Sequence, residues 1–205
     1  MSASDSGVVS PVPEHLHTVT PRLVVLDGAA AIAFYARAFG AGQIGERFTG
    51  PGGELIHAEL RIGDSVVMIT EDAVDGPVSP PERLGGKVTC VLSLYWADVD
   101  VAWERAVAAG AEVIYPLEDQ FYGERGGRLR DPFGQQWMMS QHIEDVPAGE
   151  MARRAAAFSF GRQPVRPGEA RTSGRQSHAG RHAQGEVAAG TLTWQVSRRA
   201  LRWVL

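Results

Sequence analysis

The segment "TVTPRLVVLDGAAAIAFYARAFGAGQI", residues 18–44, decides the fold because a second segment repeats its order. It runs from β-favouring residues through an aspartate into an alanine-rich amphipathic stretch, which Gly40 ends. The segment "TCVLSLYWADVDVAWERAVAAGAEVI", residues 89–114, also passes from a strand pattern into a helix pattern. Asp98 is its candidate N-cap and Gly110 its candidate C-cap. The repeat predicts two copies of one structural unit.

Three strand-like runs follow each predicted helix. Gly-rich turns separate the runs in both halves, and the Asp131–Gly134 turn precedes the last one. Glycine and aspartate supply the positive φ angles that tight hairpins require. Each half therefore reads βαβββ. Because four strands cannot bury one face alone, we expect an α+β fold in which duplicated βαβββ modules enclose a central cleft. A ferredoxin-like or doubly wound sheet needs a second helix per half, which the stretch between Gly50 and Asp72 does not provide.

The chain divides into segments of different composition. The folded domain is predicted over residues 17–145, with modules at 17–73 and 87–145 joined by a Pro- and Gly-rich linker. We expect a flexible N-terminus over 1–16 and a short helix over 146–160. Residues 161–205 are low in complexity and basic, and they are expected to be disordered because they bury little apolar surface.

Charge and composition limit the partners and the compartment. The net charge is −4, and residues beyond Phe160 carry +6, so residues 1–160 carry −10. An acidic body argues against nucleic acid as a partner. No apolar run approaches the roughly 18 residues of a membrane helix, so no membrane partner is expected. The lone Cys90, expected to be a small buried strand residue, and the lack of a signal-peptide pattern favour the cytoplasm.

Three stretches together resemble a known superfamily. They are "AIAFYARAFGA" (31–41), "IHAELRIGDSVVMITED" (56–72) and "YGERGGRLRDPFGQQWMM" (122–139). In this order, on duplicated βαβββ modules, they resemble the vicinal oxygen chelate superfamily, which includes glyoxalases, bleomycin-resistance proteins and extradiol dioxygenases. The likeness is greatest to the small bacterial glyoxalase-like branch, and it covers roughly residues 17–145. It implies a small-molecule ligand in the cleft between the modules and assembly as a homodimer.

The resemblance also allows a test for a catalytic metal. Metal-dependent members hold their ion with four His or Glu ligands from the first and last strands of each half. The matching places here are Pro21 to Leu23 (with His17 slightly before them), Met68 or Ile69, Val91 or its neighbours, and Met138. A thioether does not replace a carboxylate on a hard or borderline divalent ion. We therefore expect no metal or other cofactor; a divalent metal is the disfavoured alternative.

His57 is the ionisable residue of most interest in the first half. Strand alternation places Ile56, Ala58 and Leu60 on one face, and His57 and Glu59 on the other. Because the apolar face should meet the helices, His57 and Glu59 are expected to face the cleft. They are the candidate catalytic residues, with His57 as a general base or ligand-binding group. The alternative is a histidine satisfied by hydrogen bonds at the sheet edge.

The second half supplies the candidate ligand-binding residues. By the same alternation, Gln136, Met138 and Ser140 should face the cleft while Trp137 joins the core. A methionine gives an adaptable apolar wall, and amide and hydroxyl groups orient a ligand. Tyr122 and Arg130 lie nearest the expected opening, where an arginine could hold an anion. A solvated charge on an exposed hairpin is the alternative for Arg130.

Three functional hypotheses follow. In the first, the protein binds an aromatic or anionic small molecule without a catalytic metal. In the second, it is an enzyme of the same fold, a lyase, isomerase or dioxygenase that uses a divalent metal or His57 as base. The third is a regulatory protein that acts through its tail. The sequence does not name the ligand.

Overall fold

The structure is a computed structural model that describes residues 10–73 and 76–160. The predictions for residues 1–9 and for the tail at 161–205 lie outside the described residues. The described part forms two compact units, one ending at Pro147 and the other beginning at Ala148. The second unit contributes the helix α3 (Ala148–Phe160).

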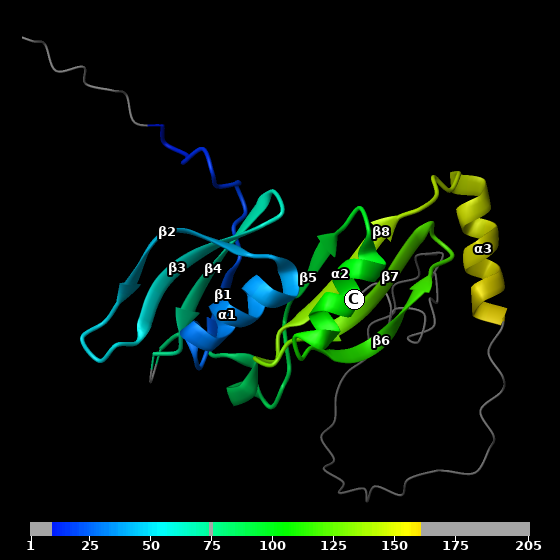
Figure 1. Ribbon diagram of the computed structural model, residues 1–205. Coiled ribbons are helices and arrows are strands. Elements are labelled where there is room, and N and C mark those ends of the chain that lie inside the picture. The colour runs from blue at the N-terminus through cyan, green and yellow to red at the C-terminus, as the bar shows by residue number, and fades with distance from the viewer. Residues whose placement is uncertain (1–9, 74–75, 161–205) are drawn as a thin grey trace, which may run out of the picture. The chain divides into compact units, whose positions relative to one another are not determined.

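The first unit consists of two βαβββ modules, so the predicted fold is confirmed (Figure 1). In each module the first and last strands are parallel neighbours, and the other pairs are antiparallel. The first sheet has the order β1-β4-β3-β2 and the second the order β5-β8-β7-β6, so the two sheets are separate. The elements of the first module are β1 (Arg22–Val25), α1 (Gly28–Phe39), β2 (Gly42–Thr49), β3 (Leu55–Ile62) and β4 (Ser65–Glu71). Those of the second are β5 (Val91–Tyr95), α2 (Val99–Ala108), β6 (Glu112–Asp119), β7 (Glu124–Arg130) and β8 (Gln136–His142).

The two helices begin in the same way. Asp27 and Asp98 both have extended backbones and accept a hydrogen bond from the N–H three residues on, at 2.8 and 3.1 Å. Each side chain thereby satisfies one of the N–H groups that a helix start leaves unpaired. At the other end Gly40 adopts φ 66° and closes α1, while Gly110 follows the C-cap of α2 with φ 112°. The local chemistry therefore sets matching boundaries in the two modules.

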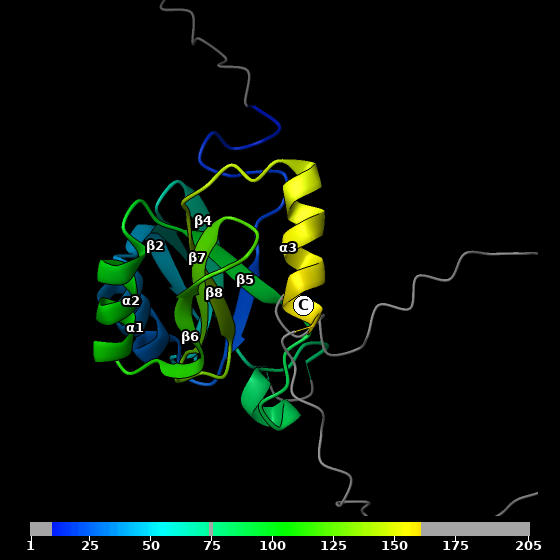
Figure 2. The same cartoon turned by 90° about the vertical axis from the view of Figure 1, so that its right-hand side faces the viewer.

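Helices α1 and α2 cover one side of the strands and contact each other (Figure 2). One hydrophobic core continues beneath them from module to module. Its centre is aromatic: the Trp137 ring lies 4.8 Å from that of Phe39 and 5.6 Å from that of Tyr35. Trp137 is fully buried, as predicted. Offset and edge-on aromatic packing adds to the free energy of burial, so these rings hold the two modules together.

The segment between the modules differs from expectation at one residue. Cys90 is exposed, so its prediction as a buried strand residue was wrong: it lies at the end of the linker, directly before β5. The linker contains a 3-10 helix, η1 (Pro81–Leu84).

In the part of the chain that the structure describes, every helix is too short or too polar to span a bilayer.

Candidate functional site

His57 and Glu59 lie on the face of the first sheet that the helices leave open. Ala58, Leu60 and Ile62 alternate with them and are buried on the helix side. The Glu59 carboxylate lies 3.4 Å from Nε2 of His57 and 2.8 Å from Nε2 of His15. Glu59 therefore joins two imidazoles and ties the segment before β1 to the sheet. The structure thus brings the predicted residues His57 and Glu59 together. It adds His15, which was not predicted to lie beside them.

The open face of the second sheet carries the predicted β8 residues. Gln136 and Met138 are half-buried there, while Trp137 and Met139 point into the core. Ser140 is on the same face but only 1% exposed. A Cβ on Gly126 would lie 3.1 Å from the Ser140 hydroxyl, so the β7 backbone runs closely past that side chain. Alternation along the strand thus follows the predicted pattern.

Tyr122 and Arg130 lie at opposite ends of β7. Tyr122 is in the turn between β6 and β7, beside the ring of Phe121. Its pKa is raised, mainly by burial and to a lesser extent by the negative charge of Glu124. Arg130 is at the β7 end, where it donates a 2.8 Å hydrogen bond to Glu112 on β6. The structure does not bring these two residues together.

The places that the family uses for metal ligands hold unsuitable side chains. In the strand register, Arg22 pairs with Met68 on the open face of the first sheet, and Ser93 pairs with Met138 on that of the second. The guanidinium of Arg22 lies 3.4 Å from the Met68 sulfur. Ile69 faces the core and Val91 pairs with Gln136. A guanidinium, a hydroxyl and two thioethers do not form a donor set for a divalent ion.

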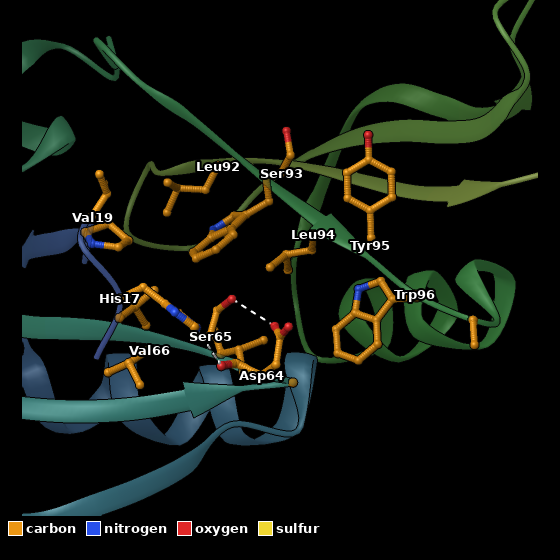
Figure 3. Close-up of a pocket in the computed structure, with 16 residues that line it drawn as sticks. His17, Val19, Asp64, Ser65, Val66, Leu92, Ser93, Leu94, Tyr95 and Trp96 are labelled. Atoms are coloured by element: carbon orange, nitrogen blue, oxygen red, sulfur yellow. Dashed lines mark hydrogen bonds between the residues drawn. The ribbon is translucent and has the colours of Figure 1, made fainter. Parts of the chain in front are cut away.

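A cavity of about 610 Å³ lies between the modules, at the seam where the β3–β4 turn and the start of β4 face β5 (Figure 3). Its volume falls in the range of sites for small organic molecules. The walls are mainly apolar and include Val66, Leu92, Leu94 and Trp137. His17 and Val19 bring the segment before β1 to the same space (Figure 3). None of the seven predicted site residues lines this cavity.

Few polar groups converge on the cavity. Asp64 and Ser65, hydrogen-bonded to each other at 2.9 Å, border it from the turn between β3 and β4 (Figure 3). On the β5 side, Nε1 of Trp96 is buried and has no hydrogen-bond partner among the described residues. A buried N–H without a partner costs free energy. Trp96 is held in place by Arg105, whose guanidinium lies 5.5 Å from its ring and donates to the Ala38 carbonyl.

Asp131 fixes the back wall of the cavity. One oxygen of this buried carboxylate accepts from the Tyr35 hydroxyl at 2.7 Å and from the Trp137 indole at 2.8 Å. The other oxygen accepts from the backbone N–H groups of Phe133 and Gln135. Burial raises the pKa of Asp131, and the hydrogen bonds from Trp137 and Tyr35 oppose that rise. The turn interpretation of Asp131 holds, but the residue also joins α1 of one module to β8 of the other.

Local sequence signals did not reveal the seam. Trp96 and Asp64 line one cavity only because β5 of the second module lies beside the β3–β4 turn of the first. One available signal was Pro21 directly before β1, since proline favours the edge of a sheet. The other was the shortness of β1 and β5, also typical of edge strands.

The fold and this geometry agree with a family assignment. The sequence model of the Glyoxalase/Bleomycin resistance protein/Dioxygenase superfamily matches residues 15–139. The chain belongs to this superfamily.

Two mycobacterial proteins and one solved structure are similar to this chain. An uncharacterized protein of Mycobacterium bovis is 43% identical over 146 residues, which covers 70% of this chain and 93% of the relative. An uncharacterized protein of Mycobacterium tuberculosis is also 43% identical over 146 residues, which covers 70% of this chain and 84% of that protein. Among solved structures, TioX from Micromonospora sp. ML1 is 30% identical, with a TM-score of 0.49 over 60% of this chain and 97% of that one.

Proposed function

We propose that the protein binds a small, largely apolar and aromatic molecule in the seam cavity and does so without a catalytic metal. The observation that carries the proposal is the cavity itself: a mainly apolar space of about 610 Å³ between the modules, with Leu92, Leu94 and Trp96 in its lining. Apolar walls would exclude water, and a few polar groups would orient the ligand. Membership of a superfamily that includes bleomycin-resistance proteins is consistent with binding as the function.

A titration with N-phenyl-1-naphthylamine tests this proposal, because this uncharged dye fluoresces when it enters an apolar site. We expect a dissociation constant on the order of 10 µM. The variant Ser65→Phe places a ring in the cavity from an exposed position and should weaken binding about tenfold. Thr49→Phe, at an exposed site on β2, is the matched control and should bind like the wild type. No binding by the wild type, or equal binding by Ser65→Phe, would contradict the proposal.

The metal-free part of the proposal has its own test. Protein purified without chelators should contain less than about 0.1 equivalent of zinc, nickel or iron, because the family's ligand places lack suitable donors. A stoichiometric metal would instead support an enzyme of the same fold. One observation favours that second candidate: His57 lies beside Glu59, which could orient it as a general base. A His57→Gln variant that lost a turnover present in the wild type would establish this role.

We also propose that the chain acts in the cytoplasm as a homodimer. The outer strands β2 and β6 are each paired on one side only within the described residues. Unpaired sheet edges favour association with another chain. Light scattering coupled to gel filtration should give about twice the mass of 22.1 kDa. A monomer mass at micromolar concentration would contradict the dimer.

A further inference from the structure

A second cavity, of about 370 Å³, lies at the other end of the seam. Strand β1 and Leu92 of β5 border it, and the linker residues around η1 complete it. Pro21 and Leu92 line both cavities. The two spaces therefore adjoin at these two residues.

The two cavities differ in charge. The larger one has Asp64 and the titratable His17 in its lining and no lysine or arginine. The smaller one has Arg22 and Lys87 and no aspartate or glutamate. Neither of these cations forms a salt bridge with a carboxylate in the described part of the chain, although Arg22 contacts the Met68 sulfur. Both side chains are exposed and remain available to an anionic group.

Beside the cations, the Thr89 hydroxyl is the neutral donor that suits an anion. Thr89 and Gln135 also line the smaller cavity. The Gln135 amide nitrogen donates to the Cys90 carbonyl at 2.9 Å, which fixes the side chain across the start of β5. Charged donors bind carboxylate, sulfonate and phosphate oxygens more strongly than neutral donors do.

We infer that the seam is one elongated site for an amphiphilic anion, with the apolar body in the larger cavity and the anionic group beside Arg22 and Lys87. This inference rests on the proposed function, because it needs the larger cavity to hold the apolar part. It narrows the ligand class from aromatic molecules in general to those that carry a carboxylate, sulfonate or phosphate at one end. Asp64, which lines the larger cavity and not the smaller one, would disfavour the reverse orientation.

Two dyes that differ by one group test the inference. 1-Anilinonaphthalene-8-sulfonate is N-phenyl-1-naphthylamine with an added sulfonate. The affinity for the uncharged N-phenyl-1-naphthylamine reports on the larger cavity. The difference in affinity between the two dyes reports on the smaller cavity. We expect the sulfonate dye to bind about fivefold more tightly, since exposed charge pairs contribute modestly. It should displace the uncharged dye, and its advantage should shrink at 1 M salt, where the screening length is about 3 Å.

Variants then locate the anion. Lys87→Gln and the double variant Arg22→Gln/Lys87→Gln should remove the advantage of the sulfonate dye and leave the affinity for the uncharged dye unchanged. Arg37→Gln, a cation in the last turn of α1, is the matched control and should change neither. Equal affinity of the two dyes, no displacement, or an unchanged advantage in both variants would overturn the inference while the proposed function stands. Failure of the uncharged dye to bind would instead overturn the proposed function.

Discussion

The two modules share a framework and differ at the turn before their last strand. In the first module the turn at Asp64 is exposed, and among the described residues its carboxylate accepts a hydrogen bond only from the neighbouring Ser65. In the second module the turn at Asp131 is buried, and its carboxylate reaches α1 of the other module through Tyr35. Duplication therefore sets the strands and helices, while one hairpin of the second copy joins the copies and closes the back of the cavity.

The largest expected effect comes from breaking that join. Asp131→Asn puts an amide among four hydrogen-bond donors, and at least one buried donor then loses its acceptor. We expect the free energy of unfolding to fall by about 3 kcal/mol. Chemical denaturation measures it, with Asp64→Asn in the other turn as the control, expected within about 0.5 kcal/mol of the wild type. Equal effects of the two variants would refute the asymmetry.

A second difference lies under the helices. Ala58 of β3 pairs with Ile69, and Gly127 of β7 holds the equivalent place opposite Met139. A Cβ on Gly127 would lie 2.7 Å from the Trp103 ring and 2.9 Å from the Pro116 carbonyl. Gly127→Ala should therefore cost about 2 kcal/mol through overpacking. The reciprocal Ala58→Gly should cost about 1 kcal/mol, mainly through chain entropy. A stabilised Gly127→Ala variant would show that Trp103 can move aside.

The helix caps test what the modules share. Asp27→Ala and Asp98→Ala each remove one capping hydrogen bond, so each should lower the free energy of unfolding by about 1 kcal/mol. Thermal or denaturant unfolding of both variants measures this directly. If one cap cost more than twice as much as the other, the helix starts would not be energetically equivalent.

The smallest effect concerns the ends of the edge strands. Strand β1 ends in the buried Val25, whereas β5 ends in Tyr95, which is 61% exposed. Tyr95 donates a 2.8 Å hydrogen bond to Glu124, and this bond, with lesser effects of burial and charge, raises its pKa to about 12. Glu124→Gln removes the carboxylate charge, so the pKa should fall toward its usual value of about 10. Phenolate absorbance during a pH titration, with Tyr95→Phe to assign the signal, measures the shift; an unchanged titration would contradict it.

Sequence patterns predicted the framework well, for reasons that are local. The caps at Asp98 and Gly40 and the alternation around His57 and Trp137 depend on near neighbours in the chain. The seam depends on contacts between residues far apart in sequence. The bond from Tyr35 to Asp131 spans 96 positions, and nothing in a short turn signals its distant partner. The roles proposed for His57, Glu59, Tyr122, Arg130, Gln136, Met138 and Ser140 remain predictions.

The most direct test of the account is to locate a bound aromatic molecule. Crystals soaked with 1-bromonaphthalene, whose bromine scatters anomalously, would show where an apolar ring settles. We expect one bromine peak between β4 and β5, in contact with Leu94 and Trp137. A peak on the open faces over His57 or Met138, with the seam empty, would contradict it.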